Sequence, residues 1–122
     1  QFAVATPLQA ALADFLRECP AHARELPAFY QAKRDHFARL LAGTRFRAVP
    51  AASTYFQLAD YAAISDLPDT EFARQLTVVH GVAAIPISVF SERPPASERI
   101  VRFCFAKHEA TLDAAAAKLR ML

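Results

Sequence analysis

The stretch Ile100-Val-Arg-Phe-Cys-Phe-Ala-Lys107 determines how the rest of this sequence is interpreted. It leaves almost no polar face, and a strand that is apolar on both sides is normally covered on both sides. Arg102 does not fit that environment, because a guanidinium stays protonated in proteins and is costly to bury unpaired. Arg102 therefore either pairs with a local acid such as Asp60 or Glu109, reaches solvent at an edge, or binds the carboxylate or phosphate of a ligand.

The composition bounds the class of protein. With 122 residues, 54% of them hydrophobic and 21% charged, the chain is expected to fold as one globular domain. The net charge is +2, and the basic residues are scattered, so no nucleic-acid partner is expected. No apolar run is long enough to cross a membrane. Cys19 and Cys104 have no neighbours at metal-ligand spacing, which indicates no metal site and a reduced, cytoplasmic setting.

The periodicity predicts an α+β fold in which helices pack against a small, mostly antiparallel sheet. Helices are expected from residue 6 to 19, from about 20 to 43, from 66 to 80 and after residue 108. Strands are expected at 46–49 and 54–59, which form an antiparallel pair, at 82–85, and from residue 100 onwards. Residues 87–90 are expected to form an irregular turn, and residues 91–98 an exposed loop.

Local signals refine these elements. Thr6 is expected to cap the first helix, with Gln9 completing a capping box. Pro27 should kink the second helix or mark its true beginning, and Gly43 should cap its C-terminus. The cluster Lys33-Arg-Asp35 is expected on the solvated face of this helix. In the third helix Phe72, Leu76 and Val79 are expected to be buried, and in the last helix Leu112, Ala116 and Leu119.

Five segments, in order, resemble the C-terminal end of fold-type I aminotransferases, the pyridoxal-phosphate (PLP) enzymes of the kynurenine and methionine aminotransferase group. They are Phe2–Gln9, Lys33–Asp35, Thr54–Phe56 with Asp60–Tyr61, Gly81–Phe90 and Val101–Lys107. The chain departs from the family at Ser53, where glycine is usual, which questions the backbone geometry of that loop.

This resemblance implies a division of the chain into residues 1–20, which join a large domain that is absent here, and residues 21–122, the small domain. In the family, the lysine that holds PLP precedes the segment that matches Gln1, and the sequence is expected to be a piece of a longer polypeptide. None of the three lysines has the family's Schiff-base context. PLP is therefore expected in the full-length enzyme and not on this chain alone, and no catalytic residue is assigned.

The resemblance also implies the substrate-binding residues. Arg102 stands where the family binds the α-carboxylate of the amino-acid substrate. Phe56 matches an aromatic residue of the substrate pocket, although an ordinary core phenylalanine is an equal alternative. Ser88 and Phe90 fall in a stretch that approaches the active site, and ordinary turn packing is the alternative for both.

Three hypotheses for function follow. Val4 and Ala5 match positions that reach toward the neighbouring subunit's active site in the family. The first hypothesis is therefore that this chain is the C-terminal part of a homodimeric aminotransferase. It would act on a hydrophobic, sulfur-containing or aromatic amino acid and a 2-oxo acid, and this chain alone would be inactive. The second is a non-catalytic binding or dimerisation module with the same fold. The third is an unrelated α+β domain. This hypothesis requires that the five segments match the aminotransferase family in the correct order by chance.

Overall fold

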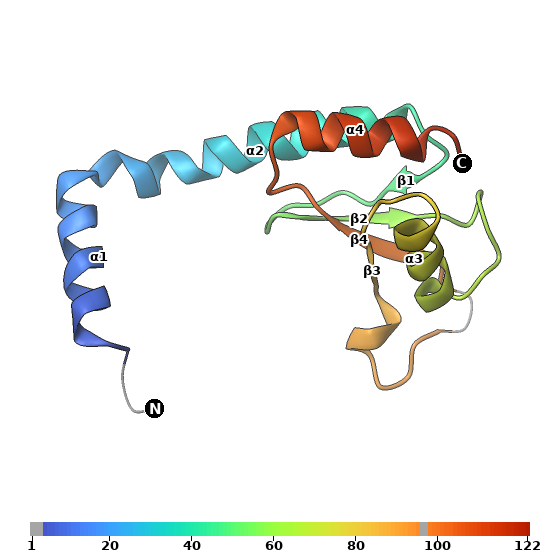
Figure 1. Ribbon diagram of the computed structural model, residues 1–122, viewed down its shortest axis with the longest axis horizontal. Helices are drawn as coiled ribbons and strands as arrows, with labels where there is room; N and C mark the ends of the chain where they lie inside the picture. The colour runs from blue at the N-terminus through green and yellow to red at the C-terminus, as the bar shows by residue number, and fades with distance from the viewer. Residues whose placement is uncertain (1–3, 96–97) are drawn as a thin grey trace. The chain divides into compact units, whose positions relative to one another are not determined.

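The computed structural model describes residues 4–95 and 98–122, so Phe2, which begins the first segment that resembles the family, lies outside the described part. Figure 1 shows helices α1 (Thr6–Glu18), α2 (Pro20–Ala42), α3 (Asp69–Val78) and α4 (Glu109–Leu119), together with a short 3₁₀ helix η1 (Ser88–Phe90). The strands are β1 (Arg47–Ala48), β2 (Phe56–Asp60), β3 (Ile85–Pro86) and β4 (Ile100–Cys104). The chain forms two compact units, Gln1–Gln31 and Ala32–Leu122.

The first unit contains α1 and the beginning of α2. The predicted capping box at α1 is wrong, because Ala5 is the N-cap and no side chain caps the helix. Gln9 instead donates from Nε2 to the Val4 carbonyl at 2.6 Å. The α1 helix has no buried residue, and an apolar stripe on it is exposed: Leu8, Leu12, Phe15 and Leu16. None of the described helices has the length and apolar character needed to cross a bilayer.

Helix α2 begins at Pro20 and continues past Pro27, so Pro27 does not mark its beginning. The buried residues of this helix, Phe37 and Leu41, both lie in its second half, whereas Phe29 is exposed. The helix ends at Ala42, next to Gly43 as predicted.

The second unit is built on a four-stranded sheet in the order β1-β2-β4-β3, and every neighbouring pair is antiparallel. This confirms the predicted fold class and the pairing of the first two strands. Arg47 pairs with Asp60 at the β1–β2 ladder. Arg102 pairs with Leu58 of β2 on one side and with Ile85 of β3 on the other.

The two faces of the sheet differ, which corrects the expectation that β4 is covered on both sides. Val101 and Phe103 point to a buried face, together with Gln57 and Ala59 of β2. Arg102 and its neighbours on the other face are only half-buried. Because side chains alternate along a strand, helices on one face leave the face of Arg102 open.

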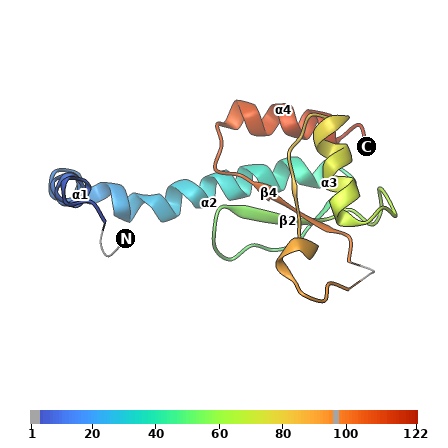
Figure 2. The ribbon, with the colours of Figure 1, turned by 60° about the horizontal axis from the view of Figure 1, so that its bottom comes forward.

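Aromatic contacts join the helices to the buried face. The Phe103 ring meets Phe37 of α2 at 5.9 Å and Phe46 at 5.6 Å between centroids. Phe46 also meets Phe72 of α3, whose ring stacks on Tyr61 at 3.9 Å. Within the second unit, α4 and the end of α2 lie on the same side of the sheet in both ribbon views (Figures 1 and 2).

Three further predictions need correction. The strand expected at 82–85 is β3 at Ile85–Pro86, and Val82 is a buried residue before it. Val79, expected in the core, is 68% exposed because it follows the last turn of α3. In the loop before β2, the positive φ belongs to Thr54 (68°) and not to Ser53.

Candidate functional site

Arg102 lies in the middle of β4, on the open face of the sheet, where its guanidinium contacts two phenylalanine rings. Its guanidinium carbon is 4.0 Å from the centroid of the Phe56 ring and 4.7 Å from that of the Phe90 ring. Phe56 comes from β2, where it is diagonal to Arg102 in the ladder register, and Phe90 ends η1. A cation held against aromatic faces gains electrostatic energy from the ring quadrupoles while its hydrogen-bond donors stay available.

The two acids considered as local partners do not pair with Arg102 in the described residues. Asp60 accepts from the Ala62 amide at 2.8 Å and from Nη2 of Arg47 at 2.5 Å. These two hydrogen bonds lower the pKa of the Asp60 carboxyl below its usual value. Glu109 opens α4 and is exposed. Asp60 is thus an ionised carboxylate already bound to a different arginine.

The Nε atom of Arg102 is buried and has no hydrogen-bond partner among the residues that the structure describes. An unsatisfied buried donor costs about 1–3 kcal/mol, and more when the group is charged. Such groups are rare in folded proteins and call for an explanation, such as a ligand that supplies the acceptor. An anion with two oxygen atoms is the acceptor that matches the planar guanidinium.

Arg102 also forms part of the wall of a cavity of about 420 Å³. Apolar side chains from β4, α4 and the segment before β3 make up most of this wall, and Lys107 and Lys118 add two more cations. No aspartate or glutamate occurs among the described residues of the lining. The surroundings of Arg102 therefore combine positive charge with apolar surface, which suits an anion that carries an apolar group.

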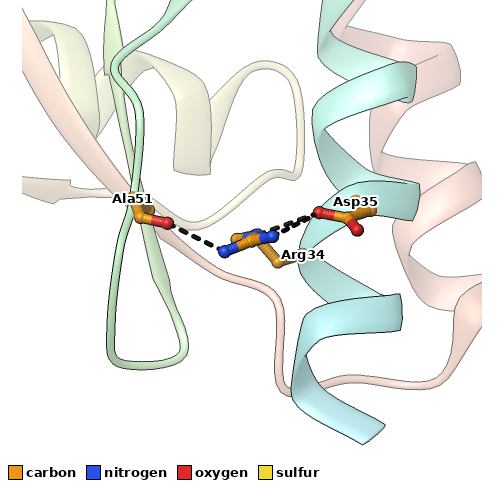
Figure 3. Close-up of polar contacts among 3 residues, drawn as sticks. All are labelled: Arg34, Asp35 and Ala51. Carbon is orange, nitrogen blue, oxygen red and sulfur yellow. Dashed lines mark hydrogen bonds and ion pairs between the residues drawn. The ribbon is translucent and has the colours of Figure 1, made fainter. Parts of the chain in front are cut away.

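The loops next to Phe56 are held by α2, which corrects the prediction that Lys33-Arg-Asp35 is a solvated face. Arg34 donates to Asp35 from Nε at 2.9 Å and to the Ala51 carbonyl from Nη1 at 3.2 Å (Figure 3). Lys33 donates from Nζ to the Lys107 carbonyl at 2.6 Å. These bonds attach α2 to the loop that precedes β2 and to the segment that follows β4.

The remaining predicted site residues lie apart from one another in the chain, Ser88 in the second unit and Val4 and Ala5 in the first. Ser88 does not contact Arg102 in the described hydrogen bonds, because its hydroxyl donates to Asp69. Val4 and Ala5 belong to the first unit, where their carbonyls accept hydrogen bonds from the beginning of α1. Sequence reasoning missed Asp69, whose contact with Ser88 joins positions 19 residues apart and leaves no local pattern.

The lysines of this chain do not fit the requirements of PLP. Lys33 is bound to the Lys107 carbonyl, and Lys118 donates from Nζ to the Gly81 carbonyl at 3.3 Å. Lys107 is exposed. An aldimine lysine is usually desolvated or placed beside another cation that lowers its pKa, and PLP further needs an acid against its pyridine nitrogen. The contacts of these three lysines therefore do not match those expected of a lysine that holds PLP.

Comparison with known proteins identifies the family. The family model for aminotransferase class I and II matches residues 1–119. Methionine aminotransferase of Escherichia coli K12 is 51% identical over 121 residues, which are 99% of this chain and 31% of the relative. Kynurenine–oxoglutarate transaminase 3 of Rattus norvegicus is 36% identical, over 93% of this chain and 29% of the relative.

The fold agrees with this result. The crystal structure of YbdL from Escherichia coli, identified as having a methionine aminotransferase function, superposes with a TM-score of 0.93 at 51% identity. That match covers 100% of this chain and 32% of YbdL, so this chain spans about a third of the proteins that it matches. The chain belongs to the aminotransferase class I and II family.

Proposed function

We propose that this chain is the C-terminal part of a PLP-dependent aminotransferase and that Arg102 binds the α-carboxylate of its amino-acid substrate. The observation that carries the proposal is the buried Nε of Arg102, which has no partner among the described residues although its ring neighbours hold the guanidinium in place. Of the two acids considered as partners, Asp60 is bound to Arg47 and Glu109 is exposed. The hydrogen-bond acceptor for Arg102 would therefore arrive with the substrate.

The contacts of Arg102 support a role in both binding and orientation. A carboxylate that accepts two parallel hydrogen bonds is held in one plane, which limits the positions of the Cα atom attached to it. Phe56 and Phe90 would keep water from the faces of the guanidinium and strengthen the pair, because a charge pair is stronger when water is excluded. The apolar surface beside Arg102 favours a hydrophobic, sulfur-containing or aromatic amino acid, with the matching 2-oxo acid as its product.

The rest of the enzyme would supply the chemistry. PLP and its lysine belong to the large domain, which would join this chain through residues 1–20, whereas residues 21–122 would form the small domain. Val4 and Ala5 would approach the active site of the second subunit in a homodimer. The chain alone would then bind no PLP and would transfer no amino group.

The test is Arg102→Lys in a full-length enzyme that contains this chain, with Arg47→Lys as the control. Both substitutions keep the charge and remove the planar fork, but Arg47 pairs with Asp60 at the exposed β1 edge. Removing one partner of a desolvated charge pair costs about 2–5 kcal/mol. We expect Arg102→Lys to lower kcat/KM by more than about tenfold, with effects on both kcat and KM, and Arg47→Lys to leave it unchanged.

The fold should survive Arg102→Lys, because the substitution keeps the positive charge beside the two rings and removes an Nε that has no hydrogen-bond partner among the described residues. Unchanged turnover in a correctly folded Arg102→Lys enzyme would contradict the proposal. If no full-length enzyme containing this chain turned over any amino acid, while the chain still bound carboxylates through Arg102, the alternative of a non-catalytic binding or dimerisation module would replace it.

A further inference from the structure

Helix η1 places the Phe90 ring against Arg102, but apolar packing does not explain how η1 is held. The helix is only three residues long, and none of its residues is buried. Val89 and Phe90 are 59% and 62% exposed. A short 3₁₀ turn has little stability of its own, so its position must come from contacts with the rest of the second unit.

The carboxylate of Asp69 makes those contacts. Its Oδ2 accepts from the Ser88 amide at 2.7 Å, and its Oδ1 accepts from the Ser88 hydroxyl at 2.7 Å. Both oxygens therefore bind the first residue of η1. Asp69 is an acidic residue that is only 6% exposed, and these bonds offset the cost of burying its carboxyl group.

Asp69 is itself fixed by the core. It is the first residue of α3, and the next turns of that helix bury Phe72 and Leu76. The Phe72 ring stacks on Tyr61 directly after β2. The position of the Asp69 carboxylate thus follows from the packing of α3 against the sheet, and the bonds to Ser88 transmit this position to η1.

We propose that Asp69 is a positioning residue for Arg102, acting through Ser88 and the Phe90 ring. This inference rests on the proposed function, in which Arg102 binds the substrate carboxylate. Without Asp69, η1 would keep its covalent link to β3 but lose both bonds that set its orientation. The Phe90 ring would then move away from the guanidinium. The guanidinium would adopt orientations in which it could not donate two parallel hydrogen bonds to a carboxylate.

The test uses Asp69→Ala, Asp69→Asn and Ser88→Ala in the full-length PLP-loaded enzyme. Glu71→Gln is the matched control, because Glu71 lies in the same first turn of α3 and is exposed. We expect Asp69→Ala to lower kcat/KM by about three- to tenfold, the range for one lost cation–π contact at a partly desolvated site. Asparagine keeps one acceptor for the Ser88 amide and should recover part of the loss, and Glu71→Gln should have no effect.

A double-mutant cycle separates positioning from general destabilisation. If Asp69 acts through the Phe90 ring, Asp69→Ala combined with Phe90→Leu should be no worse than Phe90→Leu alone. In the 122-residue chain, the Nε–Hε resonance of Arg102 should also lose the Phe90 part of its ring-current shift in Ser88→Ala, while the part from Phe56 remains. Ser88→Ala keeps the hydrogen bond from the backbone amide of residue 88 to Asp69. This variant therefore tests the positioning role even if Asp69→Ala does not fold.

Additive losses in the cycle, or an Arg102 resonance unchanged in Ser88→Ala and Asp69→Asn, would overturn the positioning role. The proposed function itself is tested separately by Arg102→Lys. A large loss in Arg102→Lys with normal kinetics in all Asp69 and Ser88 variants would refute only the role of Asp69. Normal kinetics in Arg102→Lys would refute the carboxylate site, whatever Asp69 does.

Discussion

The guanidinium carbon of Arg102 lies 4.0 Å from the centroid of the Phe56 ring, across the β2–β4 ladder. This contact takes the place of the acid that an arginine with a buried Nε normally requires. Ring quadrupoles attract the guanidinium and leave its hydrogen-bond donors free, whereas a carboxylate would attract it and also occupy those donors. A protein arginine that must stay ready to bind an anion therefore gains more from phenylalanine than from aspartate.

The first prediction concerns the aromatic character of Phe56. In the full-length enzyme, Phe56→Leu should lower kcat/KM by about three- to tenfold, because leucine fills similar space without a quadrupole. Phe56→Tyr keeps the ring and should retain most of the activity. Equal kinetics for the leucine and tyrosine variants would instead indicate that Phe56 only fills space on the sheet.

The second prediction concerns PLP on the chain alone. Incubation with PLP, borohydride reduction and peptide mapping should give no stoichiometric adduct at any one lysine. The reason is that Lys33 and Lys118 bind backbone carbonyls and Lys107 is exposed. A single lysine modified to completion would contradict the proposal that the PLP-binding part lies outside this chain.

The third prediction concerns self-association through the apolar stripe of α1. Leu8 and Leu12 are 66% and 57% exposed, and large exposed apolar patches are unusual on soluble monomers. Light scattering at high protein concentration should show association of the chain. Leu8→Glu with Leu12→Glu should abolish it, whereas Ala10→Glu, on the opposite side of α1, should not. A monomeric parent chain would refute the prediction.

The fourth prediction concerns stability at alkaline pH. Burial of Tyr61, whose hydroxyl donates to the Leu67 carbonyl, raises its pKa to about 12. The unfolded chain releases this proton near the ordinary value of about 10. The stabilising contribution is thus complete below about pH 10 and is lost as the pH rises toward 12.

Urea denaturation from pH 7 to 12 measures this effect. The free energy of unfolding should fall above about pH 10 in the parent chain, and Tyr61→Phe should remove most of that fall. At neutral pH the same variant should be about 1 kcal/mol less stable, because the Leu67 carbonyl loses its donor. Tyr55→Phe, at a residue that is 46% exposed, is the control and should keep the alkaline decline.

The fifth prediction compares the two glycines. Gly81 has a φ of +63°, and an added Cβ would lie 2.9 Å from the flexible Nζ of Lys118. Gly81→Ala should cost about 1–2 kcal/mol because of the left-handed backbone. Gly43 has no positive φ and an added Cβ there would meet nothing closer than 3.4 Å, so Gly43→Ala should be neutral or stabilising by about 0.4–1 kcal/mol. Equal costs by thermal denaturation would contradict this assignment.

Local chemistry in the sequence determined the four helices and the fold class, although it did not locate β3 correctly. Helical spacing at Phe72, Leu76, Leu112 and Leu119 located two helices, because apolar residues on one helical face must be buried. Two apolar segments close in sequence indicated the antiparallel pair β1–β2, since a short connection permits little else. The conflict between Arg102 and its apolar neighbours was likewise visible in one strand.

Only the tertiary structure decided what surrounds Arg102. Which face of β4 the helices cover, and which ring or acid reaches the guanidinium, depend on strand register and on residues far apart in the chain. The Asp69–Ser88 bonds span 19 positions, and the Lys33–Lys107 bond spans 74. Such contacts arise because packing of the core brings fixed backbones together, and no periodicity or local propensity of the sequence encodes them.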